Sequence, residues 1–141
     1  MATLKKLETR IETNIKKAWY ENGLCMMEIQ QNGLYKKDYG TFKKYIKDRW
    51  GYSEQHGYRM IDSAETYQLL DHEKLTQKDD LGELSEPVLP ENERQIRPLL
   101  ELETYGEKAH VWRTVIDKYD RISARVIKDE VDAFIKHPIK V

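Results

Sequence analysis

The sequence of 141 residues predicts an all-α protein, with one helical domain followed by a second, smaller helical subdomain. Apolar residues recur three and four positions apart through most of the chain, which is the period of an α-helix. No stretch shows the strict alternation of apolar and polar residues that indicates a half-buried strand. Residues that cap or stop helices stand at the ends of the helical patterns, and they divide the chain into its elements.

The first element is a long helix over residues 4–31, which carries apolar residues at helical spacing. Asn32 and Gly33 follow it, and both residues tolerate the left-handed conformation in which many helices end. We expect residues 34–40 to be a connector. The lone cysteine, Cys25, stands beside two methionines, and we expect it to be a small residue of the core.

Two helices joined by a short turn are predicted next. Thr41 is the expected N-cap of the first, whose buried stripe contains Phe42, Tyr45, Ile46 and Trp50. Gly51 ends that helix, and Ser53 caps another that extends to about residue 70. Two helices joined by a glycine-containing turn form a helix-turn-helix motif, so we assign residues 1–70 to a helix-turn-helix domain.

The second half is predicted to begin with a linker and to end with three helices. Residues 71–90 are acidic, contain glycine and two prolines, and show no clean period. Helical patterns return at about 92–102, 107–119 and 123–135, within a subdomain that spans 91–141. Pro98 is expected to break or kink the first of these helices, because it lacks a backbone N–H.

Composition indicates a soluble, cytoplasmic protein without a membrane partner. A single cysteine excludes an internal disulfide and fits a reducing compartment. No apolar run approaches the roughly 20 residues of a membrane span. The first 13 residues are charged and lack the apolar stretch of a signal peptide.

Positive charge gathers in the first half of the chain. Residues 1–70 contain twelve Lys or Arg against nine Asp or Glu, whereas residues 71–141 contain twelve against sixteen. Such an excess forms either a face for a polyanion or an ordinary solvated helix surface. It is concentrated between positions 36 and 49, where six bases stand against two acids. These bases are Lys36, Lys37, Lys43, Lys44, Lys47 and Arg49.

The predicted second helix of the motif has polar residues where DNA-reading helices contact bases. In DNA-binding examples the first helix crosses the phosphate backbone, and the start of the second enters the major groove. Glutamine pairs with adenine and arginine with guanine through two hydrogen bonds. The candidate base contacts are Gln55, His56, Tyr58 and Arg59. The candidate phosphate contacts are Lys36, Lys37, Lys43, Lys44, Lys47, Arg49 and Ser53.

The stretch TFKKYIKDRWGYSEQHGYRMIDSAE resembles an aromatic-rich pattern, F-x-x-Y-x-x-x-R-W-G-x-S-x-x-x-x-Y-R-x-I, of plasmid- and phage-encoded DNA-binding proteins. LPENERQIRPLLELE, VWRTVIDKY and ISARVIKDEVDAFI are similar to the region after the helix-turn-helix in ParB-like proteins. The resemblance spans about residues 8–135 and implies a helical DNA-binding domain that binds through residues 53–59. The chain has no room for the nucleotide-binding domain of full ParB proteins, so a nucleotide-driven clamp is not implied.

Other chemistry finds little support in the sequence. The four histidines are scattered, and none has a second histidine or a cysteine at metal-binding spacing. We expect no cofactor, no metal and no catalysis. A sequence-specific double-stranded DNA-binding protein, a transcriptional regulator or a plasmid or phage maintenance factor, is the leading prediction, and a homodimer is compatible with it. The alternative is a non-catalytic protein-interaction module, an adaptor or inhibitor that binds a protein partner.

Overall fold

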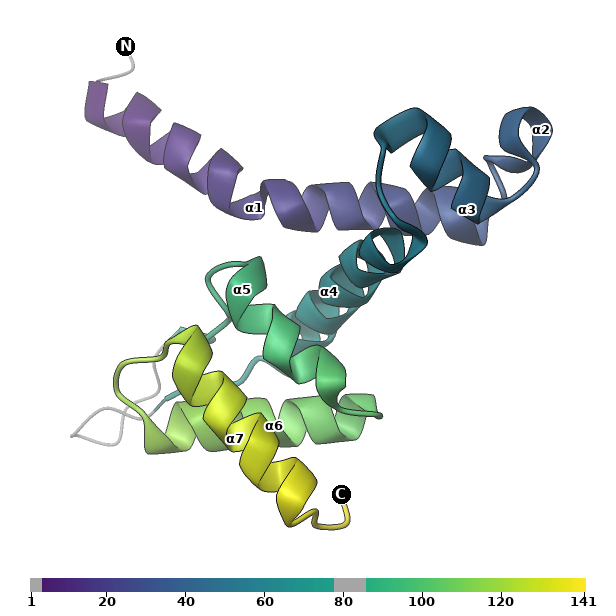
Figure 1. Ribbon diagram of the computed structural model, residues 1–141. Helices are drawn as coiled ribbons and strands as arrows, with labels where there is room; N and C mark the ends of the chain where they lie inside the picture. Colours follow the sequence, from purple (N-terminus) through teal and green to yellow (C-terminus); the bar gives the residue numbers. More distant parts are fainter. Residues whose placement is uncertain (1–3, 78–85) are drawn as a thin grey trace. The chain divides into compact units, whose positions relative to one another are not determined.

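The computed structural model describes residues 4–77 and 86–141, and the regular structure in these residues is helical, with no β-strand among them (Figure 1). The all-α prediction is therefore confirmed. The chain divides into two compact units, Met1–Ala64 and Glu65–Val141. This division lies inside helix α4 (Glu54–Glu73), earlier than the 71–90 segment where the sequence suggests a linker. Nowhere in the two described ranges is a helix long and apolar enough to span a membrane.

Unit 1 begins with α1 (Leu4–Gln31), whose bounds agree with the predicted long helix. The connector over residues 34–40 contains a short helix, α2 (Lys36–Tyr39), which the sequence does not predict. Aromatic packing explains the extra turn. The ring of Tyr35 lies 5.5 Å from that of Phe42, and the ring of Tyr39 lies 5.1 Å from that of Tyr45. These two tyrosines, four residues apart, both hold the segment against the core in a helical turn.

The predicted helix after Thr41 has two parts. Thr41 caps α3 (Phe42–Tyr45), because its hydroxyl accepts a hydrogen bond from the Lys44 N–H at 3.2 Å. The chain then widens into one turn of π-helix, η1 (Ile46–Trp50), a form that often marks functional positions. Gly51 ends it in the left-handed conformation, with φ of 73°, and its N–H bonds to the carbonyls of Ile46 and Lys47.

The core of unit 1 lies where α1, α3, η1 and α4 meet. Its buried residues include Met26, Phe42, Tyr45 and Ile46, together with Ile61 from α4. A close approach at Gly57 joins η1 to α4, because a Cβ there would collide with the Ile46 side chain. This packing fixes one side of α4 against the unit and leaves the opposite side of its first two turns exposed.

A second close approach gives a prediction for stability. Substituting alanine for Gly23 places a Cβ 2.5 Å from the Met60 carbonyl oxygen and 2.7 Å from the Ala64 Cβ, so α1 and α4 must move apart. We expect unit 1 to lose about 1–3 kcal/mol, which exceeds the roughly 1 kcal/mol that alanine gains in helix propensity. Denaturant unfolding of Gly23→Ala measures the change.

Gly106 provides the matched control. It lies in the first turn of α6, and the nearest atom to an added Cβ is the Thr104 hydroxyl oxygen at 3.8 Å. Alanine at this position has space and is expected to be neutral or stabilising. Equal effects of Gly23→Ala and Gly106→Ala would contradict the tight packing of α1 on α4.

Unit 2 contains α5 (Glu93–Ile96), the 3₁₀ turn η2 (Arg97–Glu101), α6 (Tyr105–Lys118) and α7 (Ala124–Lys136). Pro98 changes the α-helix into a 3₁₀ helix, as its missing N–H leads us to expect. The side chains of Asn92, Thr104 and Ser123 cap α5, α6 and α7. The fully buried side chains of this unit include Ile96, Leu99, Trp112, Val115, Ile127 and Val131.

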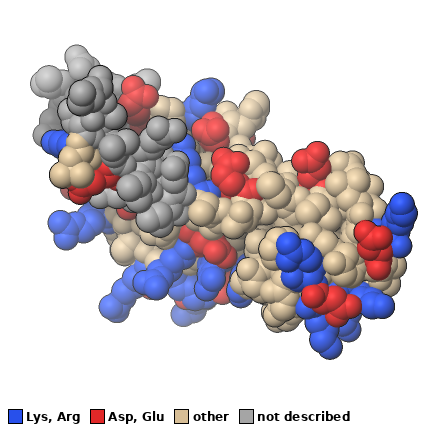
Figure 2. Space-filling model, turned by 90° about the horizontal axis from the view of Figure 1, so that it is seen from above, with Lys and Arg blue, Asp and Glu red and all other residues tan. Residues whose placement is uncertain are grey.

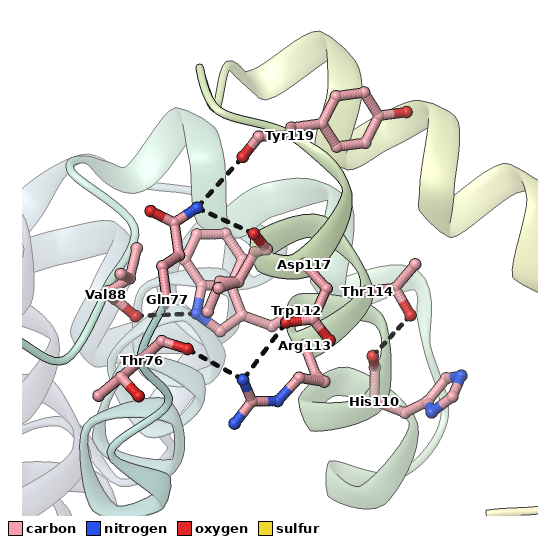
Figure 3. Close-up of polar contacts among 10 residues, drawn as sticks. Thr76, Gln77, Val88, His110, Trp112, Arg113, Thr114, Asp117 and Tyr119 are labelled. Atoms are coloured by element: carbon pink, nitrogen blue, oxygen red, sulfur yellow. Dashed lines mark hydrogen bonds and ion pairs between the residues drawn. The ribbon is translucent and has the colours of Figure 1, made fainter. Parts of the chain in front are cut away.

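Hydrogen bonds join α6 and Tyr119 to described residues of the 71–90 segment on both sides of positions 78–85 (Figure 3). The Trp112 indole N–H donates to the Val88 carbonyl at 3.0 Å, and the Arg113 guanidinium donates to the Thr76 carbonyl at 3.1 Å. The Gln77 amide donates to the carbonyls of Ile116 and Tyr119, at 2.9 and 3.2 Å. The described residues on both sides of positions 78–85 therefore belong to unit 2.

An ion pair between α6 and α7 predicts a pH dependence. Lys118 and the Tyr119 hydroxyl each donate to Glu130 Oε1 at 2.8 Å, and the Lys118 hydrogen bond is the main cause that lowers the pKa of Glu130. A carboxyl whose pKa is lower in the folded state stabilises that state above its unfolded pKa, and this stability is lost as the pH falls. We therefore expect Glu130→Gln to destabilise unit 2 near pH 7 and to matter little near pH 3. Thermal unfolding at both pH values measures this, and an equal effect would contradict it.

Candidate nucleic-acid interface

The turn between η1 and α4 presents the start of α4 to solvent. The Ser53 hydroxyl accepts a hydrogen bond from the His56 N–H at 3.1 Å, so Ser53 caps α4 as predicted. The Gly57 N–H bonds to the Ser53 carbonyl at 3.1 Å and completes the first turn. A capped and exposed helix N-terminus carries a partial positive charge, which favours a nearby anion such as a phosphate.

Two of the four predicted base-contact residues lie together on the exposed side of α4. Gln55 is exposed, and Tyr58 is 41% exposed although its ring packs edge-on against Phe42 at 5.3 Å. Asp62 follows one turn later and is also exposed. Gly57 and Ile61 are buried on the other side of the helix from Gln55, whereas Tyr58 lies at the border, with its ring against the buried Phe42.

The other two, His56 and Arg59, form a pair at the edge of this face. Both are partly buried, and Arg59 Nη2 lies 2.8 Å from His56 Nδ1. The His56 ring also contacts Tyr52 in the turn, with ring centroids 4.5 Å apart. Tyr52 is a neighbour that the sequence reasoning missed. Its position four residues before His56 is a signal for such a contact, although the turn at Ser53 obscures it.

The six predicted phosphate-binding bases are all exposed. Three acids of the same stretch are exposed as well: Asp38, Asp48 and Glu54. Over residues 36–54 this gives a net charge of +3. Figure 2 shows the mixture at its right-hand end, where α2 lies, with blue side chains separated by red ones. The surface is therefore basic in sum without being a continuous basic patch.

Aromatic side chains support the end of η1. The Arg49 guanidinium lies 4.1 Å from the centre of the Trp50 ring, in a cation–π contact. The Trp50 indole N–H donates to the Tyr45 hydroxyl at 2.9 Å, yet Trp50 is 42% exposed, so its predicted place in a buried stripe is wrong. The π-helical turn changes the register after Ile46, which explains why helical spacing fails for Trp50.

Behind the turn is a pocket of about 270 Å³ lined mainly by apolar side chains. Met26 and Ile29 of α1, Trp50, Tyr52 and Met60 contribute to it. Cys25 lines it as well and is exposed, so the expectation of a core cysteine is wrong. Met26 takes the buried position of that turn of α1, which leaves the neighbouring Cys25 at the pocket.

Within residues 4–77 and 86–141, no three His, Cys, Asp or Glu side chains are grouped so that they would hold a metal ion. Comparison with known proteins finds no matching family model, no matching curated protein and no matching solved structure. The class that the structure itself defines is an all-α protein in which a capped helix follows a glycine turn.

Proposed function

We propose that the protein binds double-stranded DNA sequence-specifically and that α4 is the helix that reads the bases. One observation carries the proposal: the capped start of α4 exposes Gln55 and part of Tyr58, beside the His56–Arg59 pair and after six exposed bases. A helix-turn-helix requires the start of its second helix to project from the domain. The close approach of Ile46 to Gly57 packs η1 against the first turn of α4, which supports the proposal.

The side chains on this face suit the two tasks of a DNA-binding surface, which are to contact bases and to contact phosphates. Gln55 has a donor and an acceptor, which together match the N6 and N7 edge of adenine. Tyr58 offers a hydroxyl for a phosphate and a ring for a thymine methyl. Lysines on α2 and α3 provide charge without a fixed geometry, which suits contacts to phosphates rather than to bases.

In this proposal the protein acts by occupying its site. The setting that we propose is transcriptional regulation, or the maintenance of a plasmid or phage genome. A homodimer on a two-fold symmetric site fits this role, because many regulators with this motif read two half-sites.

Salt dependence of binding to a generic duplex tests the proposal. Each neutralised phosphate contributes about −0.9 to the slope of log affinity against log salt, so six contacts predict a slope of about −5. The affinity for a fluorescent duplex should then fall roughly 10³-fold between about 50 and 200 mM salt. Fluorescence anisotropy measures this change. Absence of binding at the lower salt concentration would contradict the proposal and favour a protein partner.

A further inference from the structure

One hydrogen bond on α4 determines which groups beside Gln55 donate hydrogen bonds and which accept them. Arg59 Nη2 and His56 Nδ1 are 2.8 Å apart. A guanidinium has only donors, so the accepting atom in this bond is the imidazole Nδ1. An imidazole that accepts through Nδ1 is neutral and carries its proton on Nε2. The contact therefore defines one tautomer of His56.

The surroundings restrain this pair. The His56 ring contacts Tyr52 at a centroid distance of 4.5 Å, and its backbone N–H is bound to the Ser53 hydroxyl. His56 and Arg59 are three residues apart on one helix, a spacing that brings side chains together. Both side chains are partly buried, which reduces the conformational freedom that DNA binding would have to remove.

We propose that His56 and Arg59 form a reading unit that presents only hydrogen-bond donors, and that it selects guanine in the major groove. With Nδ1 occupied, the remaining polar group of the His56 ring is the Nε2–H donor, and Arg59 has donors alone. Guanine offers two acceptors there, N7 and O6, whereas adenine and cytosine each expose an amino donor. This inference rests on the proposed DNA-binding function and adds which base the unit prefers and why.

The tautomer is tested without DNA. Two-bond proton–nitrogen NMR spectra of the full-length ¹⁵N-labelled protein distinguish the two neutral imidazole tautomers and the charged ring. We expect His56 to show a proton on Nε2 and an unprotonated Nδ1, and its Nδ1 resonance to shift in Arg59→Ala, where the hydrogen bond to Nδ1 is absent. A proton on Nδ1 of His56 in the wild-type protein would overturn the inference.

The base preference is tested with two random duplex pools, one with guanine and one with 7-deazaguanine, which lacks the N7 acceptor. We expect the wild-type protein to bind the guanine pool with about tenfold or more higher affinity than the 7-deazaguanine pool, because one good bidentate contact discriminates by about that factor. This preference should vanish in Arg59→Ala and shrink in His56→Ala. Arg59→Lys, which keeps the charge but loses the planar fork, serves as a second variant and should also lose the preference.

The outcomes separate this inference from the proposed function. Binding of both pools with equal strength by the wild-type protein would overturn the guanine preference and leave DNA binding intact. An equal preference in the wild-type protein and all three variants would assign the preference to other residues and likewise overturn the inference. Failure to bind either pool would overturn DNA binding, and the inference about guanine would fall with it.

Discussion

Replacing Lys43, Lys44 and Lys47 together by glutamate is expected to lower the affinity for duplex DNA by roughly 10²- to 10³-fold at about 0.1 M salt. Each phosphate contact contributes about 0.9 of a decade in affinity at this salt concentration, so three lost contacts account for about 2.7 decades. The three lysines are exposed around α3, which makes a structural cost of the change small. Anisotropy titration of a fluorescent duplex measures the loss, and the slope against salt should become shallower.

A charge-matched control lies in unit 2. Arg121, Arg125 and Lys136 are exposed, and changing them to glutamate alters the net charge by the same amount. If the control variant loses as much affinity as the lysine variant, binding follows the total charge of the chain rather than the surface beside α4. If neither variant loses affinity, the basic residues at 36–49 are an ordinary solvated surface.

The largest expected effect on stability comes from Trp112→Ala, which should cost unit 2 about 3–5 kcal/mol. The Trp112 side chain is completely buried, and its indole N–H donates to the Val88 carbonyl (Figure 3). Alanine leaves a cavity in the core beside the middle of α6. It also removes the hydrogen-bond donor of the partly buried Val88 carbonyl. Denaturant unfolding, monitored by circular dichroism, measures the loss of free energy.

Two further variants separate packing from the hydrogen bond. Trp112→Phe retains most of the apolar volume but not the N–H, and it should cost less than alanine does. Trp50→Ala removes a tryptophan that is 42% exposed and should cost unit 1 less than Trp112→Ala costs unit 2. Similar losses for Trp50→Ala and Trp112→Ala would show that Trp112 is not the centre of a packed core.

Local signals in the sequence were sufficient for much of the fold. The ends of α1 and the caps at Thr41, Ser53 and Ser123 were predicted because a cap depends on residues only three positions apart. The short helix α2 was missed because it is held by rings of α3, a contact that no local pattern shows.

Errors of register have a different cause. The π-helical turn inserts a residue into the helical period after Ile46, so spacing predicts a buried Trp50 whereas its side chain is 42% exposed. Cys25 was misplaced because its neighbours Met26 and Met27 made an apolar run whose buried side cannot be told from spacing alone. Periodicity identifies residues that share a face, but the surrounding packing decides how much of that face is buried.

The candidate site was predictable in its location but not in its internal contacts. Spacing placed Gln55, Tyr58 and Arg59 on one face of a helix, and the structure keeps Gln55 and Tyr58 there. It places Arg59 at the edge of that face, bound to His56. A hydrogen bond between two flexible side chains depends on their rotamers and on the contact with Tyr52, which residue spacing does not determine.

Selection from a random duplex-DNA pool, followed by sequencing at two salt concentrations, tests most directly whether α4 reads a DNA sequence. We expect an enriched motif that includes guanine, binding that weakens steeply with salt, and loss of the motif in Arg59→Ala. A two-fold symmetric motif would also show that two copies bind together. Salt-sensitive binding without any motif would contradict direct reading by α4, and no binding at low salt would contradict DNA binding altogether.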